Sequence, residues 1–147
     1  MAFPQVADAD TQSGSQTANS TSWTGTYPTN LASGDLILVF VSMDGGANAT
    51  ATGFTANNNS EGTVGRTVLW RIADGTESGT FTITVSASEQ GCWRAIRIPA
   101  ASWFGAAAGL NIAGVSTGSG TTPDPPNNAP GWGALDILWI ACGASDH

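Results

Sequence analysis

Residues 35–44 read DLILVFVSMD and hold an unbroken run of six apolar residues, from Leu36 to Val41. A helix that spans a bilayer needs about 20 apolar residues, so this run is much too short to cross a membrane. It is also short for a helix of a soluble protein. Ser33-Gly34 precedes it and Gly45-Gly46 follows it, and glycines in such positions favour turns. The stretch therefore predicts a β-strand that is buried on both faces, and we expect the rest of the chain to cover it.

The composition favours short strands joined by turns over helices. Glycine accounts for 19 of the 147 residues, lysine is absent, and charged residues make up 10 % of the chain. The charged fraction of an average soluble domain is about 25 %. A chain of this length is expected to form one domain with a sizeable core.

The charge balance excludes two classes of partner. The net charge is −7, and the only cationic side chains are Arg66, Arg71, Arg94 and Arg97. Binding to nucleic acid depends on neutralising phosphates, and binding to an anionic membrane surface depends on basic clusters. We therefore expect neither a nucleic acid nor a membrane as a partner.

Several further segments alternate between apolar and polar residues with the period of a strand. The clearest are residues 64–72 and 80–85, and the threonines of the second segment are expected to face solvent or a partner. Residues 90–98 also predict a strand, but parity alone leaves its inward face open. Residues 17–26 predict an edge strand. Residues 137–142 form a second apolar run, which we expect to lie beside residues 36–41.

Together these segments predict an all-β fold with little or no helix. The expected architecture is an antiparallel β-sandwich of about eight strands, either jelly-roll or immunoglobulin-like. Residues 57–62 are expected to form a polar loop, and residues 100–110 the single short helical segment.

The expected domain organisation is simple. Residues 1–30 should form a polar N-terminal arm plus the edge strand, and residues 31–147 the sandwich, as one domain overall. The chain ends directly after its second apolar run, which is the pattern expected of a sandwich that is incomplete at its C-terminus.

The two cysteines, Cys92 and Cys142, both lie in apolar contexts typical of strands. The preferred interpretation is two free, buried thiols. A single disulfide between neighbouring strands stays open as the alternative, and it requires Cα atoms about 5.5–6 Å apart. The first six residues lack the basic and apolar regions of a secretory signal, so we expect synthesis in a cytoplasm.

No residue pattern predicts an enzyme or a cofactor site. Ser116 matches G-x-S-x-G, but the Gly, Ser and Thr residues after it do not favour a helix, and the only histidine is His147. One histidine and two distant cysteines do not make a zinc site. Asp44, Asn48 and Asp74 lack the spacing of a calcium-binding loop. We therefore expect no catalytic residue, no cofactor and no metal.

Five of the six tryptophans divide into two groups, and Trp93 is assigned to neither. Trp70 and Trp139 fall inside predicted strands and are expected in the core. Trp23, Trp103 and Trp132 fall in predicted loops or edges. These three are candidate subunit anchors or sugar-stacking platforms, and covering the core is the alternative for each of them.

A set of strand and turn segments carries a family resemblance. They read MAFPQV (1–6), SGDLILVFV (33–41) with Asp44-Gly45 after it, WRIADGTE (70–77), ITVSASE (83–89), TTPDPP (121–126) and DILWIA (136–141). Together they resemble a group of uncharacterised proteins found among the virion genes of tailed bacteriophages. The resemblance implies a β-rich virion component and carries over no catalytic or binding residue.

This resemblance leads to the expected function. We expect a structural protein of the virion, made in the host cytoplasm, that decorates or cements the head through subunit contacts. Its expected partners are the major capsid protein or other virion subunits, and further copies of itself in a homo-oligomer. The alternative is a fibre or spike module that binds a glycan or a receptor through its exposed tryptophans.

Overall fold

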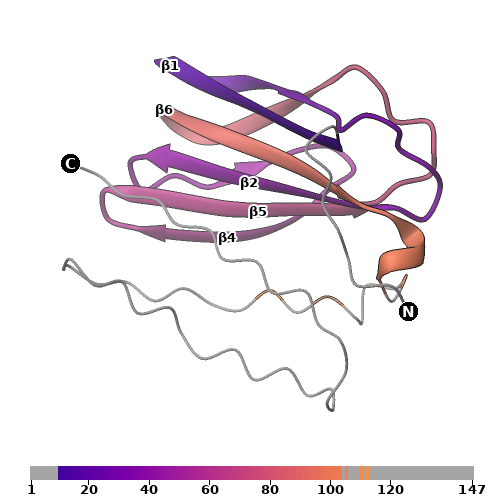
Figure 1. Ribbon diagram of the computed structural model, residues 1–147. Helices are drawn as coiled ribbons and strands as arrows, with labels where there is room; N and C mark the ends of the chain where they lie inside the picture. Colours follow the sequence, from indigo (N-terminus) through magenta and orange to yellow (C-terminus); the bar gives the residue numbers. More distant parts are fainter. Residues whose placement is uncertain (1–9, 104, 106–109, 111, 113–147) are drawn as a thin grey trace.

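The computed structural model describes residues 10–103, 105, 110 and 112, and gives only the backbone at residues 59–61. The described residues form one antiparallel sheet and a short 3₁₀ helix, shown in Figure 1. The strands are β1 (Thr11–Thr26), β2 (Leu36–Asp44), β3 (Ala49–Thr50), β4 (Thr55–Glu61), β5 (Val64–Ile72) and β6 (Thr80–Ile98), and the 3₁₀ helix is η2 (Ala100–Ser102).

Strand β2 lies in the middle of the sheet, whose order is β1-β6-β2-β5-β4. Both β5 and β6 pair with β2 along its whole length, from Leu36 to Asp44. Side chains on both faces of β2 are buried, which confirms the prediction made from residues 36–41. Strands β5 and β6 occupy both edges of β2 in the described part of the chain, and the prediction that residues 137–142 lie beside this strand stays a prediction. Residues 137–142 themselves lie outside the described residues.

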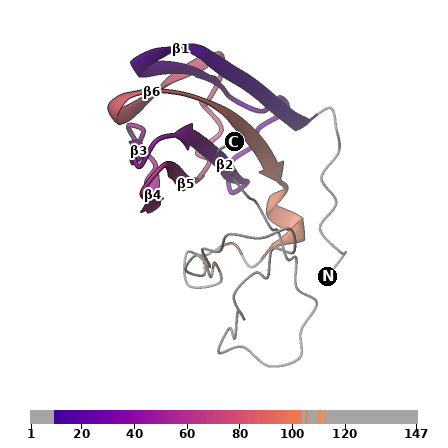
Figure 2. The ribbon, with the colours of Figure 1, turned by 90° about the vertical axis from the view of Figure 1, so that its left-hand side faces the viewer.

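The sheet folds over on itself because its two longest strands bend. The register between β1 and β6 shifts between Gln16 and Ser22, and such irregularities bend strands and increase their twist. The first half of β6 pairs with β1 and with β3, whereas its second half pairs with β1 and β2. Figure 2 shows the resulting arch, with β1 and β6 passing above β3, β4 and β5.

A buried polar bridge joins the two halves of the folded sheet. The Thr67 hydroxyl on β5 accepts a hydrogen bond from the backbone N–H of Ala49 on β3, at 3.0 Å, and donates one to Asn58 Oδ1 on β4, at 2.6 Å. Thr67 is completely buried, so this hydroxyl has no access to water. The bridge satisfies polar groups that would otherwise be buried without partners.

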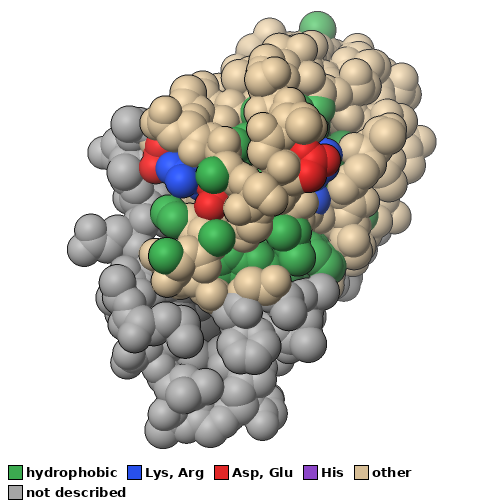
Figure 3. All heavy atoms as spheres, turned by 90° about the vertical axis from the view of Figure 1, so that its right-hand side faces the viewer, with side chains coloured by type: hydrophobic (Ala, Val, Ile, Leu, Met, Phe, Trp, Pro, Cys, Tyr) green, Lys and Arg blue, Asp and Glu red, His purple; other side chains and the backbone are tan. Residues whose placement is uncertain are grey.

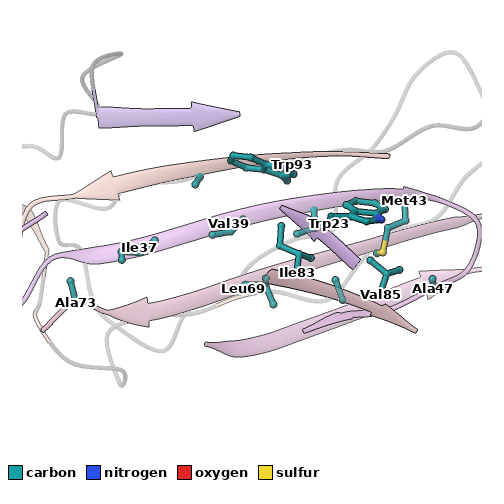
Figure 4. Packing of buried hydrophobic residues seen from close by; sticks show 13 residues of the cluster. Trp23, Ile37, Val39, Met43, Ala47, Leu69, Ala73, Ile83, Val85 and Trp93 are labelled. Carbon is teal, nitrogen blue, oxygen red and sulfur yellow. The ribbon is translucent and has the colours of Figure 1, made fainter. Parts of the chain in front are cut away.

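The main core lies between the two halves of the sheet. It is built from inward-facing residues of β1, β2, β5 and β6, with alanines of β3 and of the adjoining turns, and Figure 4 labels most of the larger members together with Ala47 and Ala73. From β2 it takes the odd-numbered positions Ile37, Val39, Val41 and Met43. The other large members are Trp23, Leu69, Ile83, Val85 and Trp93. Because side chains alternate along a strand, the even-numbered apolar residues of β2 point to the opposite face.

That opposite face carries a second, smaller apolar cluster. Leu36, Leu38, Ile96 and Ile98 are its buried members, and Phe40, Trp70, Trp103 and Leu110 pack against it. This cluster explains why the apolar run of β2 is continuous rather than alternating, since each face of the strand meets other apolar residues.

The antiparallel all-β fold class is confirmed, and two local predictions are corrected. Residues 57–61, predicted as a polar loop, belong to strand β4, where backbone pairing with β5 prevails over the low strand propensity of asparagine. Residues 80–98, predicted as two strands, form one bent strand because β1 follows them through the bend. Within the helical prediction for residues 100–110, the structure has a 3₁₀ turn at Ala100–Ser102.

The remaining architectural predictions are only partly addressed. The edge strand predicted at residues 17–26 is confirmed and begins earlier, at Thr11. Six strands are seen in the part of the chain that the structure describes, against the about eight predicted for the whole chain. The sandwich topology, the jelly-roll or immunoglobulin-like connectivity and the domain division at residue 30 stay predictions.

Candidate interaction surfaces

Two arginines close one end of the core. Arg97 on β6 and Arg71 on β5 are both paired in register with Ile37 on β2, so all three residues share the inward face. Their apolar stems border the core and their charged heads reach the rim, as is usual for arginine. Figure 3 looks onto this end of the molecule, where acidic and basic side chains lie next to one another in two places.

The first of these places is centred on Asp35, whose side chain is only 2 % exposed. Its Oδ2 accepts hydrogen bonds from Arg97 Nε at 2.6 Å and from the Ala32 backbone N–H at 2.9 Å. Its Oδ1 accepts a hydrogen bond from the Ala100 backbone N–H at 2.8 Å. Arg97 also pairs with Asp10 at 3.3 Å.

These contacts keep the Asp35 carboxylate ionised. Burial alone would raise its pKa, but the hydrogen bonds from Ala32, Arg97 and Ala100, with the positive charge of Arg97, hold the pKa below its ordinary value of 3.8. The carboxylate thereby ties together the start of β2, the end of β6 and the start of η2. This is a structural junction, because every donor around it belongs to the chain itself.

The second group of acidic and basic side chains is centred on Arg71 and stabilises the turn between β5 and β6. Arg71 pairs with Glu77 at 2.6 Å and with Asp74 at 3.5 Å, and its guanidinium lies 5.7 Å from the centre of the Phe54 ring. Glu77 accepts hydrogen bonds from the backbone N–H groups of Asp74 and Gly75. The Thr76 hydroxyl and backbone N–H donate to Asp74 and lower its pKa. Gly75 has a φ of 91°, a backbone conformation that glycine adopts readily in a tight turn.

Both ionic clusters therefore have a structural explanation. Within residues 10–103, 105, 110 and 112, no group of three or more histidine, cysteine, aspartate or glutamate side chains is arranged to hold a metal ion. Asp44 and Asp74, which are weighed above as calcium ligands together with Asn48, belong to no such group in the described residues. Ser116 and His147 lie outside the described residues.

An exposed sheet surface covered with hydroxyl groups is the most regular surface feature. We call it the hydroxyl face, and its residues are all exposed: Ser22, Thr24, Thr50, Thr80, Thr82 and Thr84. In register, Thr24 lies opposite Thr82, and Thr84 lies between Ser22 and Thr50. The face carries no charged residue. The prediction that the threonines of residues 80–85 face away from the core is confirmed.

The three candidate tryptophans have separate positions. Trp23 is 2 % exposed and lies in the main core, where its Nε1 donates a hydrogen bond to the Ser20 carbonyl at 2.9 Å. It therefore covers the core and presents no ring face to a sugar or another subunit. Trp103 is half-buried, packs on the smaller cluster and donates from Nε1 to the Gly34 carbonyl at 3.0 Å. Trp132 lies outside the described residues.

The prediction of a buried Cys92 is wrong. Cys92 is a free cysteine and is exposed, because it lies on the outward face of β6 opposite Ser15 of β1 and Ser42 of β2. Its neighbours at that end of the face are polar, whereas Ile96 and Ile98 on the same strand face are covered. Cys142 lies outside the described residues, so the pairing of the two cysteines stays untested.

Sequence reasoning missed the Asp35–Arg97 junction, although both residues were singled out. From the sequence, Asp35 is the polar residue before an apolar run, and Arg97 is one of four cations on a segment whose inward face parity leaves open. The available signal was parity, since Asp35 precedes the inward position Ile37 by two residues. Arg97, the partner of Asp35, lies 62 residues further along the chain, and it could be identified only once the order of the strands in the sheet was known.

Comparison with protein-family models, with curated proteins and with solved structures gives no match to this chain. The resemblance to phage virion proteins therefore stays a prediction. In the described part of the chain, no helix has the length and apolar character needed to cross a bilayer.

Proposed function

We propose that this chain is a structural protein of a tailed-phage virion, a decoration or cement subunit that stabilises the head through contacts with its neighbours. The proposal rests on the sequence resemblance and on one structural observation, the hydroxyl face. An uncharged, regular array of short polar side chains on a sheet is suited to packing against another protein subunit. Charged side chains at such a surface would have to be desolvated, whereas hydroxyl groups both donate and accept hydrogen bonds.

The described ionic groups fit this proposal because they hold the protein's own loops. The Asp35–Arg97 and Arg71–Glu77 pairs stiffen the end of the sheet from which two connections leave. A rigid body with a flat polar face is what a subunit needs if it binds at repeated positions on a lattice. The proposed partners are the major capsid protein, other virion subunits and further copies of the chain.

The first test is the position and copy number of the protein in intact particles. A decoration protein should be present in numbers comparable to the major capsid protein and should be visible on the head surface. A few copies confined to the tail would discard the decoration function, and absence from purified particles would discard any virion function.

The second test addresses the hydroxyl face directly. Thr82→Glu combined with Thr84→Glu should weaken binding to heads that lack the protein by about tenfold, because two charges would be desolvated in the contact. Thr52→Glu combined with Thr63→Glu adds the same charge at exposed positions away from this face and should bind normally. Equal binding by both double variants would remove the hydroxyl face from the contact.

A second candidate function is a fibre or spike module that binds a glycan. The observation in its favour is the group of half-buried aromatic residues Phe40, Trp70 and Trp103 around the smaller apolar cluster. Such rings can stack on sugars. Titration of tryptophan fluorescence with host polysaccharide should then saturate, and Trp103→Ala should abolish binding that Trp103→Phe retains. No saturable change in the wild-type protein would discard this alternative.

A further inference from the structure

The outer edge of β1 has the properties of a strand that pairs with another strand. Among the described residues, β1 lies at the end of the sheet order and pairs only with β6. An edge strand leaves a row of backbone N–H and C=O groups available for pairing. We call residues 12–16, which precede the bend of β1, the β1 edge.

Within the described residues 11–26, the β1 edge lacks the sequence features that normally protect a sheet edge. Natural edges carry charged residues, prolines or bulges, or are very short. From Thr11 to Thr26 the chain contains neither a charged residue nor a proline, although its net charge is −7. The register of residues 12–16 with β6 is regular, and the irregularity begins only after Gln16.

The inward face of this edge is already filled. The Trp93 ring lies over Gly14, where an added Cβ would come within 2.8 Å of its Cε2 atom. An aromatic ring over a cross-strand glycine holds the strand flat against its neighbour. The nearest acidic residue, Asp10, is bound to Arg97 and Asn30, so its charge is already partnered. What is available for a partner is therefore the backbone edge itself, together with the exposed side chains of Ser13 and Ser15.

We infer that the β1 edge pairs with the β1 edge of a second copy of this chain, in an antiparallel arrangement about a two-fold axis. Identical strands meet all the requirements of such a contact, because each supplies the same donors and acceptors to the other. Only serine, glycine and glutamine face each other across the two edges, so the acidic chain pairs with itself along residues that carry no charge of their own. Arg94 on β6 lies opposite Ser13 and adds no negative charge there. The sheet then continues from one copy into the next.

The inference names one partner of the proposed virion protein, a second copy of the same chain. Its biological role therefore rests on the proposed function. A contact of about five residues from each copy buries a small surface area, well below the lower limit of about 1,200 Å² for a standard protein interface. We therefore expect weak self-association in solution. On a lattice, many such contacts reinforce one another through effective concentration.

Charge swapping at Ser15 tests the pairing, because its partner on β6 is the uncharged Cys92. Sedimentation analysis of the wild-type protein at about 100 µM and above should show a monomer–dimer equilibrium. Ser15→Glu alone and Ser15→Lys alone should each weaken dimerisation by about fivefold, since like charges would lie across or diagonal to each other. An equimolar mixture of the two variants should restore it. Thr52→Glu is the control and should dimerise normally.

A cysteine scan provides a second measurement that does not depend on charge. In a Cys92→Ser, Cys142→Ser background, single cysteines introduced at Gln12, Ser13, Ser15 and Gln16 should yield a disulfide-linked dimer only near the two-fold axis; Gly14 is left unchanged because Trp93 leaves no room for a side chain there. Cysteine at Thr52 should yield none. A wild-type protein that stays monomeric, or crosslinking equal at Thr52 and at the β1 edge, would overturn the inference.

The two proposals fail in distinguishable ways. A protein that dimerises through the β1 edge but is absent from virions keeps this inference and loses the proposed function. A protein that occupies the head in many copies, with Ser15→Glu and Ser15→Lys dimerising like the wild type, keeps the proposed function and loses this inference.

Discussion

Arg97 Nε lies 2.6 Å from Asp35 Oδ2, and this contact joins the last residues of β6 to the residue before β2. Asp35 is almost completely buried and Arg97 largely so. The same carboxylate also receives two backbone N–H groups, from Ala32 and Ala100. One acidic side chain therefore satisfies three donors from three different segments at the open end of the core.

Asp35→Asn should destabilise the fold by about 2–4 kcal/mol, because it leaves the Arg97 guanidinium largely buried without its closest counter-ion. Chemical denaturation of the two proteins measures the difference. Asp44→Asn, at the exposed far end of the same strand, is the matched control and should change stability by about 0.5 kcal/mol or less. A loss below about 1 kcal/mol for Asp35→Asn would show that the junction is not a main support of the fold.

The same carboxylate should make stability depend on pH. Because the folded-state pKa of Asp35 lies below the ordinary 3.8, its contribution is complete above that ordinary value and is lost as the pH falls through the lowered one. The free energy of unfolding, measured from pH 7 to pH 2, should fall more steeply in the wild-type protein than in Asp35→Asn. Parallel pH profiles for the two proteins would contradict the assignment.

The Thr67 bridge should also be measurable. Thr67→Val keeps the shape of the side chain but removes the closer of the two acceptors of the Ala49 N–H, the other being Asn58 Oδ1, and the hydroxyl that donates to Asn58, so we expect a loss of about 1–3 kcal/mol. Amide hydrogen exchange at Ala49 should accelerate at the same time. Thr82→Val, an exposed counterpart on β6, should leave stability nearly unchanged. Unchanged exchange at Ala49 would mean that the bridge does not hold β3 in place.

Gly91 on β6 should not tolerate a side chain. An added Cβ would meet the Ser42 carbonyl on β2 and would lie 2.7 Å from Cη2 of Trp23. Gly91→Ala should therefore destabilise the protein by about 2–3 kcal/mol, as overpacking of a core does. Thermal unfolding measures the change. Gly79→Asn is the comparison, since nothing lies within 4 Å of that position and asparagine accepts its φ of 69°. Equal melting temperatures for Gly91→Ala and the wild type would mean that β2 and β6 separate easily.

Strands whose apolar and polar residues follow the two-residue period of an extended backbone could be predicted from the amino-acid sequence. The apolar run from Leu36 to Val41 required a strand covered on both faces, and the alternation of residues 64–72 matched β5 from end to end. These predictions succeed because side-chain direction in a strand follows from chain geometry alone. The antiparallel all-β class followed from the same patterns together with the abundance of glycine, serine and threonine.

The packing of the strands was needed to show which face of residues 90–98 is inward and which residues far apart in the chain meet. Parity placed Cys92 and Ile96 on one face of β6, but only the neighbouring strands made that face polar at one end and apolar at the other. Trp23 became a core residue because β1 bends, and the asparagines of β4 joined the sheet because β5 offered them backbone partners. Such outcomes depend on contacts between residues far apart in the chain, which no local period encodes.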